Sequence, residues 1–328
     1  MDIFHYKIIY FAYGLLGSYL TTFFLIPIIK KIGLYYSIVD RPDKRKLHNS
    51  ALVRIGGTSF LVSEIFIFLS FLFFQRLDDS FYLFDNFGFF FLLVTLFFLV
   101  GFFDDLFNLS PLKRLFFQTA IASLAWLNGF RIDNFDISFL NKSMNFFEIP
   151  LLISFIISVL WIVGITNAFN WLDGLDGLAA GVGAIISFGF FILNLINGQA
   201  VLGLFSASLF SICLGFLHYN AYPASILMGD GGSYFLGSNL GLLSILTYAN
   251  TTIENNFLVI LTLFALPVFD MLAVICLRLF NKKSPFLPDN NHFHHRLLKL
   301  GFSHQKSVIY IYFISIFFLS LSIFLSRN

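Results

Sequence analysis

Charged residues are scarce in this sequence. They make up 12% of its 328 residues, whereas a soluble domain usually carries roughly 25%. Hydrophobic residues make up 58% of the chain, 48 residues are Phe, and the mean hydropathy is +0.84. A soluble fold of this composition would leave far too much apolar surface facing water, which excludes the soluble class. The composition therefore predicts an integral membrane protein.

Cysteine is scarcer still: the chain has two, Cys213 and Cys276, which lie apart in apolar runs. They therefore offer neither a disulfide framework nor the spacing of a metal site. The formal net charge of +2 gives no indication of nucleic-acid binding, and we expect no nucleic-acid partner. The first hydrophobic run lacks a basic leader and continues to full spanning length, so we expect no cleavable signal peptide.

Long apolar runs, in contrast, fill most of the chain. A spanning helix needs about 20 mostly apolar residues, and this criterion predicts about ten spans, the fourth being the weakest. No sequence unit of about 20–50 residues repeats along the chain, and no linker interrupts the apolar pattern. We therefore expect one all-α membrane domain over residues 1–328. The expected spans lie near residues 8–29, 56–75, 87–103, 114–130, 149–166, 177–195, 199–217, 233–250, 256–280 and 307–326.

The positions of Lys and Arg predict the orientation, because the cytoplasmic loops of membrane proteins are enriched in these residues. Of the 20 Lys and Arg residues, fifteen fall at the loops that follow the odd-numbered spans, and five fall on the other side. This asymmetry places the odd loops in the cytoplasm and both termini outside. Loss of the weak fourth span would invert every segment after it.

Polar residues gather in these cytoplasmic loops. The first loop, Asp40–Gly57, reads "DRPDKRKLHNSALVRIGG". Its basic cluster is typical of a topology anchor or a contact with anionic lipid, but Lys46 and His48 are followed by a Gly-Gly pair that lets backbone approach a ligand.

In the second loop, Asp104 and Asp105 adjoin the end of a Phe-rich segment. Acids at the hydrocarbon edge are costly and indicate function; the alternative is a solvated pair at a helix end.

The third loop contains the densest polar motif, "NAFNWLDGLDGLAAG" at residues 167–181. Two amides and then two carboxylates repeat an i, i+3 spacing that places each pair on one helix face, and Gly174 and Gly177 interrupt the helix. Two Asn residues alone would be typical of interhelical contacts, but four polar side chains with two glycines indicate a ligand site. The four side chains are Asn167, Asn170, Asp173 and Asp176.

The fourth and fifth loops add candidates for binding anions. In "MGDGGSYFLGS", Asp230 lies in a glycine-rich turn at the start of a helix, where backbone N–H groups bind anions and an Asp can hold a divalent cation. Alone, this motif would indicate only a turn. The fifth loop, "PDNNHFHHRLLKLG", is compatible with zinc or with solvated residues, but a phosphate or sugar clamp fits better because Cys is absent. Its candidate residues are His292, His294, His295 and Arg296.

Together, these motifs indicate Mg²⁺-assisted phosphoryl chemistry on a nucleotide-activated substrate at one membrane face. The same segments resemble the polyprenyl-phosphate N-acetylhexosamine-1-phosphate transferases, bacterial enzymes that start peptidoglycan lipid, teichoic acid linkage and O-antigen synthesis. The matching motifs are "DRPDKRKLH…GG", "DDLFN", "NAFNWLDGLDGLAAG", "GDGGSYFLG" and "HFHHRLL". They occur in the family's order and extend from Asp40 to Leu298.

The resemblance implies that a sugar-1-phosphate moves from a UDP-sugar, GlcNAc or a related N-acetylhexosamine, to undecaprenyl phosphate with release of UMP. It implies a multi-pass protein of the bacterial inner membrane with a cytoplasmic site, and it is compatible with a homodimer. The third and fifth motifs resemble the UDP-N-acetylhexosamine branch more than the UDP-muramoyl-pentapeptide branch, which is the alternative. A transporter or flippase is the alternative of another class, but its polar groups would lie on both faces.

The resemblance also implies roles for single residues. Asn170 and Asp230 would hold Mg²⁺, with Mn²⁺ as a substitute, on the pyrophosphate. Asp104 would deprotonate or orient the lipid phosphate, with Asp105 beside it. The uracil would lie near Asp176 and Asp173, and the phosphate and sugar side would be lined by Lys46, His48, His292, His294, His295 and Arg296.

Two positions depart from the family pattern. Arg114, which we count with the catalytic residues, stands where relatives often carry a Lys, so the charge is kept but its geometry is not. Asn108 replaces a third acid after the Asp pair. Direct attack by the lipid phosphate and double displacement through an aspartyl phosphate both fit these residues, and we favour direct attack. Glu64 and Asp270 lie inside apolar spans; we expect Asp270 to pack against the site and assign no role to Glu64.

Overall fold

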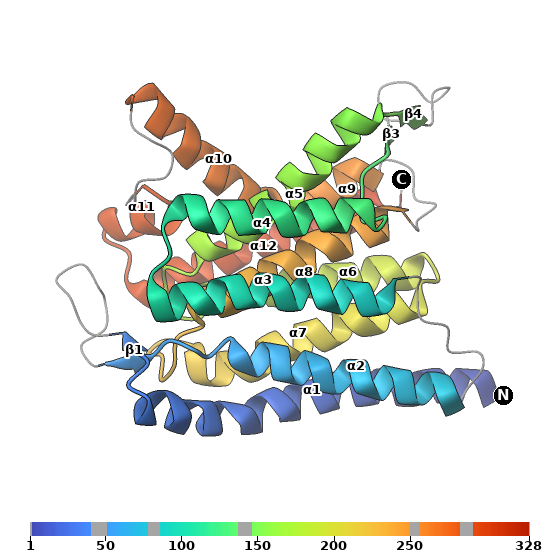
Figure 1. Cartoon of the computed structure of the whole chain (residues 1–328), viewed down its shortest axis with the longest axis horizontal. Helices are drawn as coiled ribbons and strands as arrows, with labels where there is room; N and C mark the ends of the chain where they lie inside the picture. The colour runs from blue at the N-terminus through green and yellow to red at the C-terminus, as the bar shows by residue number, and fades with distance from the viewer. Residues whose placement is uncertain are drawn as a thin grey trace.

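The computed structural model describes residues 2–40, 51–77, 86–136, 146–249, 256–282 and 291–327. Within these residues the chain forms helices and two short antiparallel hairpins (Figure 1). The hairpins pair β1 (Val39–Asp40) with β2 (Leu52–Val53) and β3 (Asn134–Asp136) with β4 (Phe146–Glu148). The helices are α1 (Asp2–Tyr35), α2 (Thr58–Leu77), α3 (Phe87–Phe107), α4 (Pro111–Leu127), α5 (Leu151–Leu172), α6 (Leu178–Ile196), α7 (Ala200–Asn220), α8 (Gly229–Ala249), α9 (Asn256–Leu263), α10 (Ala265–Phe280), α11 (Phe293–Lys299) and α12 (His304–Leu325).

Every apolar segment predicted from the sequence is helical, which confirms the all-α class. The prediction omitted the two hairpins, which lie in connections between helices. Six helices of the described residues (α1, α3, α5, α6, α7 and α12) are long and apolar enough to cross a membrane, and the bent pair of α9 and α10 would make a seventh. The chain is therefore a multi-pass membrane protein.

The ninth predicted span, residues 256–280, is broken rather than continuous. α9 ends at Leu263, α10 begins at Ala265, and the two helices form an angle of 75°. Pro267 explains the break, because proline has no N–H to bond the carbonyl of Leu263 and its ring would collide with that carbonyl in a continuous helix. As a result, α10 leaves the bundle obliquely (Figure 1).

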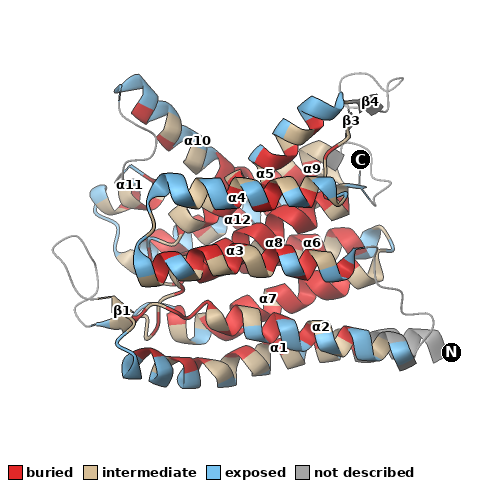
Figure 2. Ribbon diagram, in the orientation of Figure 1, coloured by how far each residue is buried: buried red, intermediate tan, exposed pale blue. Residues whose placement is uncertain are grey.

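α8 is buried along nearly its whole length and packs chiefly against α3 and α5 (Figure 2). Its first half is rich in Gly and Ser, and small residues let neighbouring helices approach closely. At Gly232, for example, a Cβ atom would lie 2.7 Å from the Cα of Gly57, which immediately precedes α2. α8 therefore forms the centre of the bundle and carries Asp230 at its N-terminal end.

The polar motifs of the sequence collect at the end of the bundle where β1 and α11 lie (Figure 1). The connections before α2 and before α8 are joined there by backbone hydrogen bonds. Leu227 N–H donates to the carbonyl of Val53 at 2.8 Å, and Gly57 N–H donates to the carbonyl of Met228 at 2.8 Å. These bonds hold the loop that precedes Asp230 in a defined position beside α2.

Candidate active site at one end of the bundle

Asp105 is an anchor at the end of α3. One carboxylate oxygen accepts hydrogen bonds from Arg54 Nη2 at 2.8 Å and from the backbone N–H of Asp230 at 3.0 Å. The other oxygen accepts from the backbone N–H of Gly231 at 3.0 Å. A carboxylate at a helix N-terminus also interacts favourably with the helix dipole. Asp105 therefore fixes the start of α8 against α3 and against Arg54.

Asp104, the neighbouring residue, points to different partners, as expected for adjacent residues of a helix. Its carboxylate accepts a hydrogen bond from Arg114 Nη1 of α4 at 2.8 Å, and it also lies within hydrogen-bonding reach of the Asp230 side chain. Only 6% of the Asp104 side chain is exposed, against 27% for Arg114. Asp104 and Arg114 therefore form a largely buried ion pair beside Asp230.

Asn170, on the last turn of α5, joins the same group. Its Nδ2 donates to the Asp230 carboxylate at 2.6 Å and to Ser233 Oγ at 3.0 Å. Arg54 Nη2 lies 3.9 Å from the other carboxylate oxygen of Asp230. The structure thus brings together Asp104, Asn170 and Asp230 from three helices that are distant in sequence, with two guanidinium groups alongside.

The donor set fits Mg²⁺. Among the residues that the structure describes, no three His, Cys, Asp or Glu side chains form a ready-made metal cluster. Mg²⁺ does not require one, because it is usually bound by one or two carboxylates together with water and substrate phosphates. The carboxylates of Asp104 and Asp230 and the side-chain oxygen of Asn170 supply that type and number of ligands.

Asp173 and Asp176 occupy different places after α5. Partial burial raises the pKa of Asp173 well above its usual range, and the negative charges of Asp230, Asp105 and Asp176 add to this effect. Asp176 instead accepts a hydrogen bond from the backbone N–H of Ala224 at 3.0 Å. Asp173 therefore faces the acidic group, while Asp176 holds the loop after α7.

Asp270 secures α11 beside the site. Its carboxylate accepts a hydrogen bond from the backbone N–H of Phe293 at 2.7 Å, and its other oxygen lies 3.0 Å from His292 Nδ1. The His292 ring also packs edge-on against Trp171 of α5, with centroids 5.4 Å apart. An acid inside the ninth predicted span thereby positions the histidine motif, which is the part of the predicted site that Asp270 contacts.

His294 is buried directly over Gly174, where the ring leaves no room for a Cβ atom. Among the described residues, neither ring nitrogen has a hydrogen-bond partner. Burial, with the adjacent His295 and His292, lowers the pKa of His294 to about 3, so this side chain is neutral at physiological pH. Arg296 is exposed and its Nε donates to the carbonyl of Asn291 at 2.7 Å.

Lys46 and His48, the other predicted contacts of the phosphate and sugar, lie outside the described residues. The sequence did not identify Arg54 as a site residue; it was counted only among the Lys and Arg residues that predict the orientation in the membrane. Its position directly before the Ile-Gly-Gly segment is the signal that could have identified it, because a cation beside a close backbone approach is suited to bind an anion.

A groove lies next to α11, between α10 and α12. It has a volume of about 240 Å³, and it is apolar except for Asp270 and Arg296 at its border. The apolar lining consists of Leu266, Phe269, Ala273, Phe293, Ile314 and Phe318. Phe269, which lines the groove, is itself exposed, as are other aromatic and aliphatic side chains of α10.

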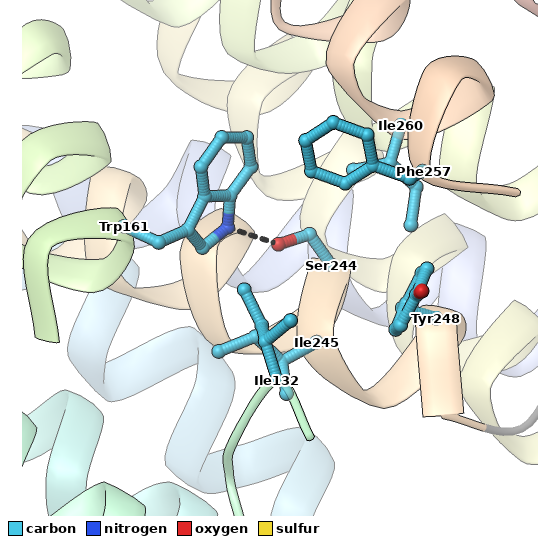
Figure 3. Close-up of a pocket in the computed structure, with 7 residues that line it drawn as sticks. All are labelled: Ile132, Trp161, Ser244, Ile245, Tyr248, Phe257 and Ile260. Atoms are coloured by element: carbon cyan, nitrogen blue, oxygen red, sulfur yellow. Dashed lines mark hydrogen bonds between the residues drawn. The ribbon is translucent and has the colours of Figure 1, made fainter. Parts of the chain in front are cut away.

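A second cavity, between α5, α8 and α9, is different in kind (Figure 3). It has a volume of about 20 Å³, which is space for about one water molecule. Trp161 Nε1 donates to Ser244 Oγ at 2.8 Å across it, and its other lining residues are mostly apolar. This cavity is a packing void and carries none of the chemistry of the acidic group.

Residues 87–248 match the sequence model of glycosyl transferase family 4. A protein of Bacillus subtilis (strain 168), described as "Probable undecaprenyl-phosphate N-acetylglucosaminyl 1-phosphate transferase", is 33% identical over 302 residues, 92% of this chain and 81% of the relative. The chain belongs to glycosyl transferase family 4. The resemblance stated from the motifs is therefore confirmed, and the family segment contains Asp104, Asp105, Asn170 and Asp230.

Two further relatives carry the two names that the motifs suggested. The undecaprenyl-phosphate alpha-N-acetylglucosaminyl 1-phosphate transferase of Thermotoga maritima is 32% identical over 283 residues, 84% of this chain and 77% of the relative. The phospho-N-acetylmuramoyl-pentapeptide-transferase of Prochlorococcus marinus (strain MIT 9312) is 34% identical over 342 residues, 95% of this chain and 90% of the relative. This family 4 member is thus similar to sugar-1-phosphate transferases with both kinds of sugar substrate.

Proposed function

We propose that the protein transfers N-acetylhexosamine-1-phosphate from a UDP-sugar to undecaprenyl phosphate, producing undecaprenyl-diphosphate-sugar and UMP. The observation that carries this proposal is the convergence of Asp104, Asn170 and Asp230 with Arg54 and Arg114 at one end of a membrane bundle. Such a site gathers anions, because paired acids hold a divalent cation and guanidinium groups bind phosphate oxygens. We name UDP-GlcNAc as the first substrate to test.

A muramoyl-pentapeptide substrate is the second candidate, and the Prochlorococcus relative favours it. The sequence of the third and fifth motifs favours the N-acetylhexosamine. A transporter is less well supported, because most of the acids, amides and guanidinium groups described above gather at one end of the bundle. Glu64 and Asn239 are exceptions that lie inside it.

Mg²⁺ is the cofactor that we propose, with Asp230 and Asn170 as its protein ligands and Asp104 beside them. When bound, it neutralises phosphate charge and stabilises the UMP leaving group. Both reacting groups are anionic, so the positive charges of Arg54 and Arg114 reduce their repulsion and stabilise the charge that develops in the transition state. Asp104 orients the lipid phosphate and accepts its proton for direct attack on the sugar-linked phosphorus.

Asp105 has a different proposed role from Asp104. Both of its oxygens accept hydrogen bonds from Arg54 or the start of α8, so an attack on phosphorus by either oxygen would disturb that anchor. The occupied Asp105 therefore supports direct attack over a double displacement through this residue, and we assign it a positioning role.

For the membrane arrangement we propose ten spans, with the bent pair of α9 and α10 as one span, and both termini outside. The site then faces the cytoplasm, where UDP-sugars are available, and the membrane is a bacterial inner membrane. The excess of Lys and Arg in the odd-numbered loops supports this orientation. The apolar groove beside α10 ends at Arg296 and suits a prenyl chain with its phosphate near α11.

The test is direct transfer by purified protein. The protein in detergent or liposomes is incubated with UDP-GlcNAc labelled in the sugar, undecaprenyl phosphate and Mg²⁺; we expect butanol-extractable label and stoichiometric UMP. Parallel reactions contain UDP-GalNAc, UDP-MurNAc-pentapeptide or EDTA. Label transfer from the pentapeptide substrate alone would replace the sugar assignment, and uptake of UDP-sugar without covalent transfer would overturn the enzyme assignment.

A further inference from the structure

Two polar side chains face each other inside the apolar bundle, away from the site. Glu64 of α2 is 2% exposed and Asn239 of α8 is fully buried. Asn239 Nδ2 donates to one carboxyl oxygen of Glu64 at 3.2 Å. Among the residues that the structure describes, the other carboxyl oxygen of Glu64 and the amide oxygen of Asn239 are buried with no hydrogen-bond partner. Each buried polar atom without a partner costs about 1–3 kcal/mol. The pair therefore lacks a hydrogen-bond donor between these two oxygens.

A single proton satisfies both orphan atoms. A carboxylate and an amide oxygen are both acceptors, whereas a protonated carboxyl group has an O–H donor. A carboxylic acid pairs with a carboxamide through two bonds, N–H to one carboxyl oxygen and O–H to the amide oxygen. Burying an ionised carboxylate without a counter-charge is very costly. Among the described residues, Glu64 has no basic ion-pair partner.

The pair lies on a regular seam between α2 and α8, which we define by three residues of each helix. Gly57 packs on Gly232, the rings of Phe60 and Phe235 lie 5.9 Å apart, and Glu64 bonds Asn239. Both series advance by three and then four residues, the spacing of a parallel two-helix seam. The two helices begin at the same end of the bundle (Figure 1).

The seam leads to the active site. Arg54 precedes Gly57 by three residues, and Asp230 precedes Gly232 by two. Backbone hydrogen bonds, such as that from Gly57 N–H to the carbonyl of Met228, already join the active-site end of this seam. The phenylalanine layer beyond it is apolar, whereas a polar pair in such a seam specifies the register. Arg54 Nη2 and Asp230, 3.9 Å apart, lie where this seam ends.

We propose that Glu64 is protonated and forms a two-bond acid–amide pair with Asn239, which fixes the register of α2 on α8 inside the bundle and thereby, together with the backbone bonds at the end of the seam, positions Arg54 against Asp230. The positioning part rests on the proposed transferase function. The protonation part does not, because it concerns the resting protein alone.

Infrared spectroscopy tests the protonation. At neutral pH the protein should show a protonated carboxyl C=O band, at higher frequency than the carboxylate stretches, that disappears in Glu64→Gln and shifts in Asn239→Leu. A band that is absent, or that survives Glu64→Gln unchanged, overturns the acid–amide pair. If the band is absent and thermal stability depends instead on a monovalent cation, the two orphan oxygens are a cation site and the proposal is wrong.

Matched variants test the positioning. Glu64→Gln retains two complementary hydrogen bonds, so we expect wild-type stability and turnover. The double variant Glu64→Leu/Asn239→Leu removes both orphan groups and should remain stable, but kcat should fall by on the order of 10- to 100-fold with little change in KM, because small displacements of catalytic groups have such effects. Ser63→Ala, which breaks a buried contact between α2 and Thr22 of α1, is the control and should retain kcat.

Register can also be measured without the reaction. Spin labels at Arg76 and Ala249, near the far ends of α2 and α8 in a background without Cys213 and Cys276, should give one narrow distance distribution. The distribution should stay narrow in Glu64→Gln and broaden in the double leucine variant. An unchanged distribution together with wild-type kcat in the double variant would refute the positioning role, even where transfer uses a sugar other than the one proposed.

Discussion

Asp105→Asn separates the anchoring role of this residue from a chemical one. The substitution keeps the side-chain volume but removes the charge, and it turns one oxygen into a donor that faces Arg54 or the N–H groups of α8. The Asp105 side chain is 1% exposed and that of Arg54 is 26% exposed. Disrupting a buried ion pair costs about 3–5 kcal/mol. Because Arg54 is partly open to water, we expect the lower end, a loss of about 3 kcal/mol in the free energy of unfolding.

The measurement compares Asp105→Asn with Asp104→Asn. At about 2 °C per kcal/mol for a chain of this size, Asp105→Asn should lower the thermal midpoint in detergent by on the order of 6 °C. Asp104→Asn weakens a hydrogen bond with one cation, Arg114, and breaks no bond to the start of α8. Because a hydrogen bond to a charged group contributes about 1.5–3 kcal/mol, we expect the lower end of that range, yet turnover should be abolished. If Asp105→Asn instead retained the wild-type midpoint and lost all turnover, Asp105 would act chemically and the anchoring argument would be refuted.

Four further substitutions test the site. Asp230→Asn and Asn170→Ala should each remove Mg²⁺-dependent transfer while leaving the size-exclusion profile unchanged; near-normal turnover would contradict the metal assignment. Gly174→Ala should displace His294, lower the free energy of unfolding by about 1–3 kcal/mol and weaken binding of the UDP-sugar. The control Gly88→Ala, at a site with open space, should change neither quantity. The pKa of His294 is about 3 in the folded protein and 6.5 ordinarily, so below pH 6.5 the unfolded chain binds more protons than the folded one. The stability that this neutral residue contributes is complete above about pH 6.5 and is lost as the pH falls toward 3. The thermal midpoint should therefore fall less steeply between pH 6.5 and 4.5 in His294→Gln than in the wild type, and equal slopes would show that His294 is not buried neutral.

The helical segments were predictable because long apolar runs have few alternatives in a membrane. The sorting of polar loops to one face was also predictable, since alternate connections between spans share a side. The different partners of Asp104 and Asp105 were not predictable, because they depend on which helices pack against each face of α3. The contacts of Arg54 and Asp270 were equally hidden: Arg54 bonds an acid 51 residues away, and Asp270 holds a helix start 23 residues away. The break of the ninth span, in contrast, could have been predicted from Pro267.

The oblique course of α10 affects how the two substrates would reach the site. An apolar groove between α10 and α12 is suited to a lipid that never leaves the membrane plane, whereas a nucleotide sugar arrives from water. For a transferase built this way, the concentrations of the two substrates are expressed in different units: per volume of water for the nucleotide sugar, and per amount of lipid for the acceptor. The relevant concentration of the lipid acceptor is its mole fraction in the bilayer or micelle, so added detergent or inert phospholipid slows the reaction by surface dilution without changing any volume concentration.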